Sequence, residues 1–434
     1  MAVTSRVIQT DKATKKRFIV GLLLFLGVII NYMDRSNLAL AAPVIGVDLN
    51  LDSVQMGLIF SAFGWSYAIL QIPGGLIVDK VKPRILYAIM LGGWSIATCL
   101  QSLVNGFSAF LGLRVILGIF EAPSYPTNNR VVTSWFPEQE RATSTAFYTS
   151  GQYVGIAFFT PLLVYIQNAF GWRGMIFITG VIGVIYSIVW YLMYRDPKDS
   201  KANEAELNYI RQGGGIVDMD GKQNVRKASW SQLKYVLKNR NIWGVFIAQF
   251  CLSSILWFFL TWFPTYLVQY RGMGFIKMGF LASLPFLAAY VGILFSGFIS
   301  DYLIKRGHSI GFARKVPIVS GLILATSIIG ANYVDDQTAV IAFMALAFFG
   351  NGLASITWVF VSALAPSHLL GLTGGIFNFM GNLSAIAVPI IIGFLAKGGS
   401  FEPALVFISS LALIGALSYI FIVGKVERIV VPEE

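Results

Sequence analysis

Long apolar runs, separated by short polar segments, recur along nearly the whole chain. A helix needs about 20 mostly apolar residues to cross the hydrocarbon core of a bilayer. Runs of this kind cover residues 18–42, 55–78, 84–104, 108–131, 143–168, 174–194, 242–269, 276–299, 315–333, 338–362, 373–396 and 402–424. The pattern therefore predicts an all-α membrane protein with twelve transmembrane helices.

The longest polar segment, residues 195–240, divides these runs into two sets of six. An internal repeat supports this division, because GGLIVDKVKPR, with Asp79, and SGFISDYLIKRG, with Asp301, end equivalent runs of the two sets. Such repeats are typical of secondary transporters, which bind substrate near the midplane between their halves. We therefore expect a six-helix half at residues 1–194, a cytoplasmic linker at 195–240 and a second six-helix half at 241–434.

Composition and charge agree with this prediction. Charged residues make up 12% of the chain, against about 25% in soluble domains. If the N-terminus is cytoplasmic, 26 of the 32 Lys and Arg lie on the cytoplasmic side, as the positive-inside rule requires. We expect a multi-pass protein of the cell membrane, the inner membrane in a Gram-negative source, with both termini in the cytoplasm. The net charge of +11 then reflects topology and contact with anionic lipid rather than nucleic-acid binding.

Two acidic residues, Asp34 and Glu121, lie well inside apolar runs. Each charge opposes insertion by about 2.5–3.5 kcal/mol, so it should be paired, neutralised or functional. Arg35 follows Asp34 directly, and Arg114 precedes Glu121 by two helical turns on nearly the same face. Two structural salt bridges are one interpretation. A functional role is favoured because apolar replacements usually stabilise a protein as well as a buried ion pair does.

Two prolines, Pro123 and Pro126, follow Glu121 in the stretch GIFEAPSYPTNNR. Each removes a helical N–H and frees the carbonyl of the residue four positions earlier. At membrane depth, this is tolerated only where the backbone faces protein or a water-filled cavity. The sequence thus predicts that Glu121 faces a central cavity.

Several stretches resemble one family of transporters. Gly75, Asp79 and Arg84, repeated in part at Asp301, resemble the signature loop of the major facilitator superfamily, although Pro83 departs from it. The stretches NYMDRSNLALA, EAPSYPTNNRVVTSWFPEQERA and FFGNGLASITW resemble the anion:cation symporter branch, most closely bacterial D-galactonate:proton symporters. The resemblance implies the major facilitator fold, alternating access and a functional monomer that imports a sugar-acid anion with protons.

The resemblance also implies roles for individual residues. Asp34 and Glu121 would be the proton-coupling acids, and Arg35 would bind the substrate carboxylate through two hydrogen bonds. Arg114 would pair with the acids, and Gly75, Asp79, Arg84 and Asp301 would form gating loops. Candidate substrate-binding residues along the polyhydroxy chain are Tyr67, Gln152, Gln249, Ser355, Thr357 and Asn378, with Trp358 as a flat apolar wall. For each of these polar residues, hydrogen bonding between helices is an equally good interpretation.

Other functions remain as alternatives or are excluded. Carriers of glucarate, galactarate or hexuronates share much of the first half, and an uncoupled anion facilitator or a non-transporting membrane sensor would have similar spans. The hydrolase-like GHSIG, residues 307–311, lies in a basic loop without a strand-to-helix elbow. His308 and His368 have no metal-ligand spacing. We therefore expect no enzymatic activity, no metal and no cofactor.

Overall fold

The computed structural model describes residues 12–217, 230–366 and 369–429. Within these ranges the chain is helical and contains no strand. His368 and part of the expected linker lie outside the described residues.

The first bundle contains α1 (Lys16–Asp48), α2 (Ser53–Lys80), α3 (Pro83–Gln101), α4 (Phe107–Glu121), α5 (Ser124–Trp135) and α6 (Glu138–Met193). A straight helix with the 56 residues of α6 would be about 84 Å long, far more than the roughly 30 Å core of a bilayer. The chain is not helical at Gly171, where φ is +71°, so α6 consists of two helices joined at a kink. These two helices match the predicted runs 143–168 and 174–194.

The second bundle is more often interrupted. It contains α9 (Arg240–Thr261) with α10 (Phe263–Thr265) and η2 (Tyr266–Tyr270), α11 (Phe275–Leu281), α12 (Ser283–Lys305), α13 (Ile310–Ala325) with η3 (Thr326–Tyr333), α14 (Gln337–Leu353), η4 (Ala354–Thr357), α15 (Trp358–Leu364), α16 (Leu370–Leu395) and α17 (Glu402–Leu417). Eleven helical segments of the described chain are long and apolar enough to cross a membrane. Because α6 holds two spans, the prediction of an all-α fold with twelve transmembrane helices is confirmed.

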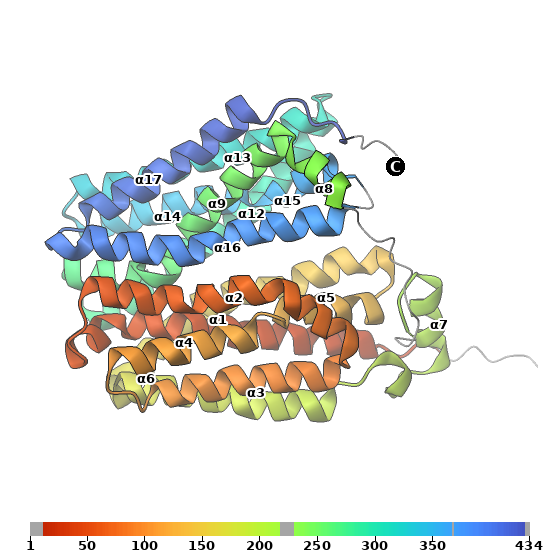
Figure 1. The fold of residues 1–434 in the computed structure, drawn as a ribbon, viewed down its shortest axis with the longest axis horizontal. Coiled ribbons are helices and arrows are strands. Elements are labelled where there is room, and N and C mark those ends of the chain that lie inside the picture. Colours follow the sequence, from red (N-terminus) through yellow and green to blue (C-terminus); the bar gives the residue numbers. More distant parts are fainter. Residues whose placement is uncertain (1–11, 218–229, 367–368, 430–434) are drawn as a thin grey trace, which may run out of the picture.

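The two bundles lie side by side, with α1–α6 in the lower group of Figure 1. Across the interface, α2 runs along α16, α6 packs against α11 and α12, and α1 contacts α9 and α10. At the end away from α7, Ser53 Oγ donates a hydrogen bond of 2.8 Å to the carbonyl of Gly393. A Cβ atom on Gly57 would lie 2.5 Å from the carbonyl oxygen of Pro389. Small residues thus let α2 and α16 touch at this end, which we call the closed end.

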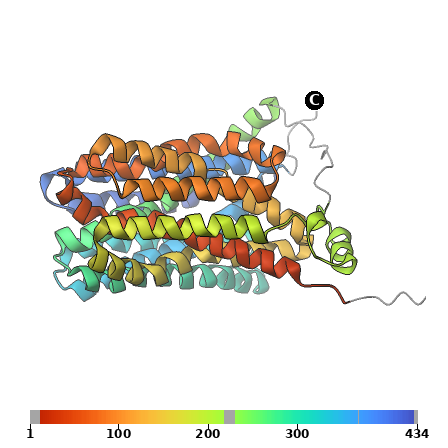
Figure 2. The ribbon, with the colours of Figure 1, turned by 90° about the horizontal axis from the view of Figure 1, so that it is seen from below.

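The opposite end carries α7 (Glu204–Gln212), which lies beside the beginning of α1 in Figure 2. Helix α1 begins at Lys16, so its first backbone N–H groups have no helical partner. The buried carboxylate of Glu206 accepts hydrogen bonds from the N–H groups of Lys16 (3.0 Å) and Arg17 (3.1 Å). Part of the segment between the bundles therefore caps α1, while α8 (Trp230–Leu237) packs against α9 and α16.

Candidate functional site

The centre of the first bundle holds a buried ion pair between α1 and α4. Arg35 Nε donates to Glu121 Oε1 at 2.6 Å, and Arg35 Nη2 contacts the same oxygen. Arg35 is 9% exposed and Glu121 is 0% exposed. The second oxygen, Glu121 Oε2, accepts no hydrogen bond from the described residues. This oxygen of Glu121 can therefore still accept a hydrogen bond.

The end of α4 places Glu121 opposite α1. Helix α4 ends at Glu121, and α5 begins at Ser124, directly after Pro123. One turn earlier, Gly118 touches α2, where an added Cβ would lie 2.5 Å from the carbonyl oxygen of Phe63. A larger residue at 118 would push α4 away from α2. The glycine contact and the proline break together fix the position of the carboxylate.

Three aromatic rings surround the guanidinium of Arg35. Its Cζ lies 4.9, 5.0 and 5.1 Å from the ring centroids of Tyr32, Phe63 and Tyr67. Phe63 and Tyr67 stack on each other with centroids 5.0 Å apart. Cation–π contacts of this kind stabilise a cation away from bulk water. Arg35 can therefore remain charged here even when its carboxylate partner is lost.

Arg114 is the second buried cation of the site. Its Cζ lies 5.4 Å from the centroid of Phe63, and its Nε donates to no described residue. It interacts electrostatically with Asp34, Arg35 and Glu121 without forming an ion pair among the described residues. We expected Arg114 to pair with an acid, but Arg35 takes that place. Seven residues along a helix correspond to a rise of about 10 Å, whereas the side chain of Arg35 reaches Glu121 from α1.

Asp34 is 1% exposed, and neither of its carboxylate oxygens has a hydrogen-bond partner among the described residues. The polar groups that interact with it include the indole of Trp94 on α3 and the hydroxyl of Thr179 on α6. Among the described residues, Trp94 Nε1 also has no acceptor, and neither side-chain polar atom of Asn31 has a hydrogen-bond partner. Sequence reasoning found Asp34 but missed this polar surrounding, which comes from three different helices.

The candidate residues of the second bundle form a separate group. Thr357 Oγ1 on η4 donates to Gln249 Oε1 on α9 at 2.9 Å, and Gln249 Nε2 donates to Ser253 Oγ at 3.3 Å. Trp358, which is 43% exposed, packs with Phe377 of α16 at a ring-centroid distance of 5.3 Å. Of the other candidates in this bundle, Ser355 on η4 is half-buried and Asn378 on α16 is exposed. Gln152, which lies on α6 of the first bundle, is half-buried.

An aromatic contact connects the two bundles near this site. Phe63, whose ring contacts both arginines, is 6.0 Å from Trp257 of α9 between ring centroids. Tyr153 of α6 and Tyr290 of α12 form a similar contact at 6.1 Å. The charged cluster of the first bundle therefore adjoins the helix that carries Gln249.

The expected gating residues lie near the end that carries α7. Gly75 and Asp79 are in the last turns of α2, and Asp301 is exposed on α12. Arg84 Nε at the beginning of α3 donates to the backbone carbonyl of Tyr191 at 3.0 Å. The Cζ atom of Arg84 also lies 4.3 Å from the centroid of the Tyr191 ring. Arg84 therefore ties α3 to the end of α6.

Two aromatic residues of the site were not among the sequence candidates. Tyr32 lies three residues before Arg35, a spacing that places both on one helix face and could have indicated it. Its hydroxyl accepts a hydrogen bond of 3.5 Å from Tyr125, which lies in the proline-broken segment. Phe63 gave no signal, because a phenylalanine in an apolar run is indistinguishable from a lipid-facing residue.

The sequence profile of the Major Facilitator Superfamily matches residues 24–389. The chain is 50% identical to a D-galactonate transporter of Escherichia coli O6:H1, over 97% of this chain and 99% of that protein. It is 43% identical to a probable galactarate/D-glucarate transporter of Bacillus subtilis (strain 168), covering 99% and 96% of the two chains. A bacterial homologue of the lysosomal transporter Spinster, solved in an inward-facing, unoccupied conformation, has a similar fold, with a TM-score of 0.76, 17% identity and 94% and 97% coverage.

Proposed function

We propose that this chain, which belongs to the major facilitator superfamily, imports a sugar acid together with protons, and that D-galactonate is its preferred substrate. It is a transporter and not an enzyme. The observation that carries the proposal is the buried cluster of two acids and two arginines on α1 and α4. The 50% identity to a D-galactonate transporter supports the choice of substrate.

Substrate binding and proton binding would be coupled through Arg35. Its guanidinium contacts Glu121, so a substrate carboxylate must compete with Glu121 for the same cation. Protonation of Glu121 removes that competition and frees Arg35 for a bidentate contact. The three aromatic rings keep Arg35 in place while its partner changes. A proton on Glu121 therefore favours substrate binding, which is the thermodynamic requirement for symport.

Asp34 would carry the second proton. A buried carboxyl group without a partner is most stable in its neutral form, and both of its oxygens are without a hydrogen-bond partner among the described residues. When it loses the proton, Trp94 and Thr179 can donate to it, and Arg114 is within electrostatic range. Two protons carried with a monoanion move one net positive charge inward, which a potential of 100 mV favours by about 2.3 kcal/mol.

The second bundle would bind the hydroxyl groups of the substrate. Gln249 and Thr357 are already hydrogen-bonded to each other, so their orientation is fixed before substrate arrives. Trp358 offers a large exposed apolar face beside them. Tyr67, Gln152, Ser355 and Asn378 complete the proposed set. Because Gln249, Thr357 and Trp358 lie on the second bundle and the charged cluster lies on the first, a substrate that contacts both would bring the two halves together.

Alternating access would consist of rocking of residues 1–194 against residues 241–434 around this site. With both termini in the cytoplasm, the closed end faces the outside, and the Ser53–Gly393 contact separates the site from the periplasm or medium. Opening would break this contact, while Gly75, Asp79, Arg84 and Asp301 would act at the cytoplasmic end. One chain supplies both halves, so we expect a monomer to be sufficient.

A second candidate substrate is galactarate or D-glucarate. The observation that favours it is Arg114, a buried cation without an ion-pair partner among the described residues. A dicarboxylate could place one carboxylate at Arg35 and the other near Arg114. The 43% identity to a probable galactarate/D-glucarate transporter agrees with this possibility.

Purified protein in liposomes distinguishes these proposals. Under an acid-outside gradient, D-galactonate, galactarate, D-glucarate, D-gluconate and glucuronate are each offered, and both current and uptake are recorded. We expect inward positive current with D-galactonate at the lowest half-saturating concentration. A lower value for the two aldarates would favour the second candidate. Uptake of D-galactonate without current or dependence on the proton gradient would contradict coupling.

A further inference from the structure

We propose that a groove between the beginning of α1 and the end of α6 binds one anionic phospholipid. The groove has a volume of about 350 Å³. Its lining residues come from α1, the end of α5 and the residues around and after the end of α6: Lys16, Ile19, Val20, Leu23, Trp135, Leu192, Met193, Arg195, Ser200 and Lys201. We call it the α1/α6 groove.

The lower part of the α1/α6 groove is apolar and open on the outer surface of the bundle. Ile19 is 45% exposed, Leu192 61% and Met193 58%. These residues lie in the first turns of α1 and the last turn of α6, where spanning helices reach the edge of the bilayer. Exposed aliphatic side chains at this depth are suited to contact a lipid acyl chain rather than water.

The mouth of the α1/α6 groove is positively charged. Lys16, Arg195 and Lys201 line it, and none of its lining residues is acidic. Arg195 Nη1 donates to the carbonyls of Tyr191 (3.0 Å) and Tyr194 (2.7 Å), which holds the guanidinium at the helix end. The ammonium groups of Lys16 and Lys201 form no ion pair with a described residue. Three cations above an aliphatic slot match the charge and shape of an anionic phospholipid.

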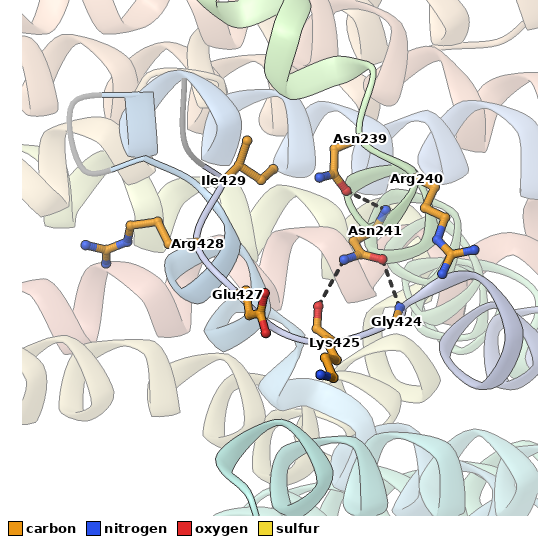
Figure 3. A pocket seen from close by; sticks show the side chains of 8 residues that line it. All are labelled: Asn239, Arg240, Asn241, Gly424, Lys425, Glu427, Arg428 and Ile429. Carbon is orange, nitrogen blue, oxygen red and sulfur yellow. Dashed lines mark hydrogen bonds between the residues drawn. The ribbon is translucent and has the colours of Figure 1, made fainter. Parts of the chain in front are cut away.

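The second bundle has a groove in the corresponding place, which can be compared with the α1/α6 groove. It lies between the first turn of α9 and the segment after α17, has a volume of about 380 Å³ and includes Arg240, Lys425 and Arg428. Figure 3 shows Asn241 bridging this segment, accepting from the N–H of Gly424 (2.8 Å) and donating to the carbonyl of Lys425 (3.0 Å).

This second groove lacks the other features of the α1/α6 groove. Glu427 lies among its cations, and its one aliphatic side chain, Ile429, is buried. It is therefore basic without an apolar slot. It offers a matched control, because the same number of positive charges can be removed there at the same end of the molecule.

Native mass spectrometry of the full chain in detergent tests the proposal. Dioleoyl phosphatidylglycerol and dioleoyl phosphatidylcholine are titrated into delipidated wild type, the double variant Lys16→Gln/Lys201→Gln and the control Arg240→Gln/Lys425→Gln. We expect one tight phosphatidylglycerol per wild-type chain and little retention of phosphatidylcholine. The first double variant should bind phosphatidylglycerol about 25-fold more weakly, about five-fold for each cation removed, while the control retains wild-type affinity.

Competition and the control variant separate a phospholipid site from a bare phosphate site and from general electrostatic attraction. Glycerol phosphate, which has the charge but no acyl chain, should not displace the bound lipid at equal concentration. Displacement would identify a simple phosphate site and overturn the proposal, as would equal binding of both lipids. Equal weakening in the two double variants would also overturn it, because the effect would then be general electrostatics. A melting temperature within a few degrees of wild type confirms that each variant is folded.

Discussion

The substitution Arg35→Gln tests the buried Arg35–Glu121 ion pair separately from the other residues of the site. It removes the cation from Glu121, which is fully buried, without changing the carboxylate itself. Removing one partner of a buried pair destabilises a protein by about 3–5 kcal/mol, since the other charge stays buried and uncompensated. The loss of contacts with three aromatic rings adds to this cost, while the nearby Arg114 offsets part of it. We therefore expect a loss of about 3–5 kcal/mol.

The double variant Arg35→Gln/Glu121→Gln is the matched control. It removes both charges and leaves two neutral amides, so it should recover at least about 2 kcal/mol of the loss, and such a difference from additivity is the signature of two residues in direct contact.

Unfolding by SDS in mixed micelles, followed by tryptophan fluorescence, measures these free energies. The two single variants, the double variant and wild type are compared under the same micelle composition. If Arg35→Gln is as stable as wild type within about 0.5 kcal/mol, or if the two substitutions are additive, the proposed energetic role of the buried pair is wrong.

Three further predictions concern other parts of the structure. Gly57→Val should prevent the closed end from closing, so that a cysteine introduced by Ser53→Cys is labelled several-fold faster from outside. Gly106→Val is the control and should not change this labelling, because a Cβ atom at Gly106 would have no atom within 4 Å. Arg114→Gln should raise the half-saturating concentration of galactarate about ten-fold or more in exchange assays, as expected for one lost charged hydrogen bond, and should change that of D-galactonate much less. An unchanged value for galactarate would separate Arg114 from the second carboxylate. Glu206→Ala should remove the cap on α1, at a cost of about 1.5–3 kcal/mol for each charged hydrogen bond lost. Tryptic cleavage next to α7 should then be faster than in wild type, and an unchanged cleavage rate would show that the cap contributes little.

The spans could be predicted from sequence because hydrocarbon thickness fixes the length of an apolar run. The break after Glu121 could also be predicted, since a proline cannot continue the hydrogen-bond pattern of a helix. The sequence also separates the apolar runs on either side of Gly171, and in the structure these two runs form one long helix that is kinked at this glycine. Each of these features depends on residues close together in the chain.

Contacts between helices could not be predicted in the same way. Arg35 rather than Arg114 meets Glu121, because the approach of α4 to α2 at Gly118 and the position of α1 decide which cation is near. Glu206 caps α1 across 190 residues of sequence, and nothing in its local pattern indicates this. The roles of the site residues in transport remain predictions for the same reason, since they depend on substrate and on movement between the bundles.

The central claim is that Glu121 couples protons to the sugar acid. It is tested most directly by recording D-galactonate currents in liposomes under an acid-outside gradient, for wild type and Glu121→Gln, with exchange of labelled substrate measured in parallel. We predict that Glu121→Gln abolishes the current but still exchanges D-galactonate, because the amide imitates the protonated acid and leaves Arg35 free. Equal current in the two proteins would contradict coupling at Glu121.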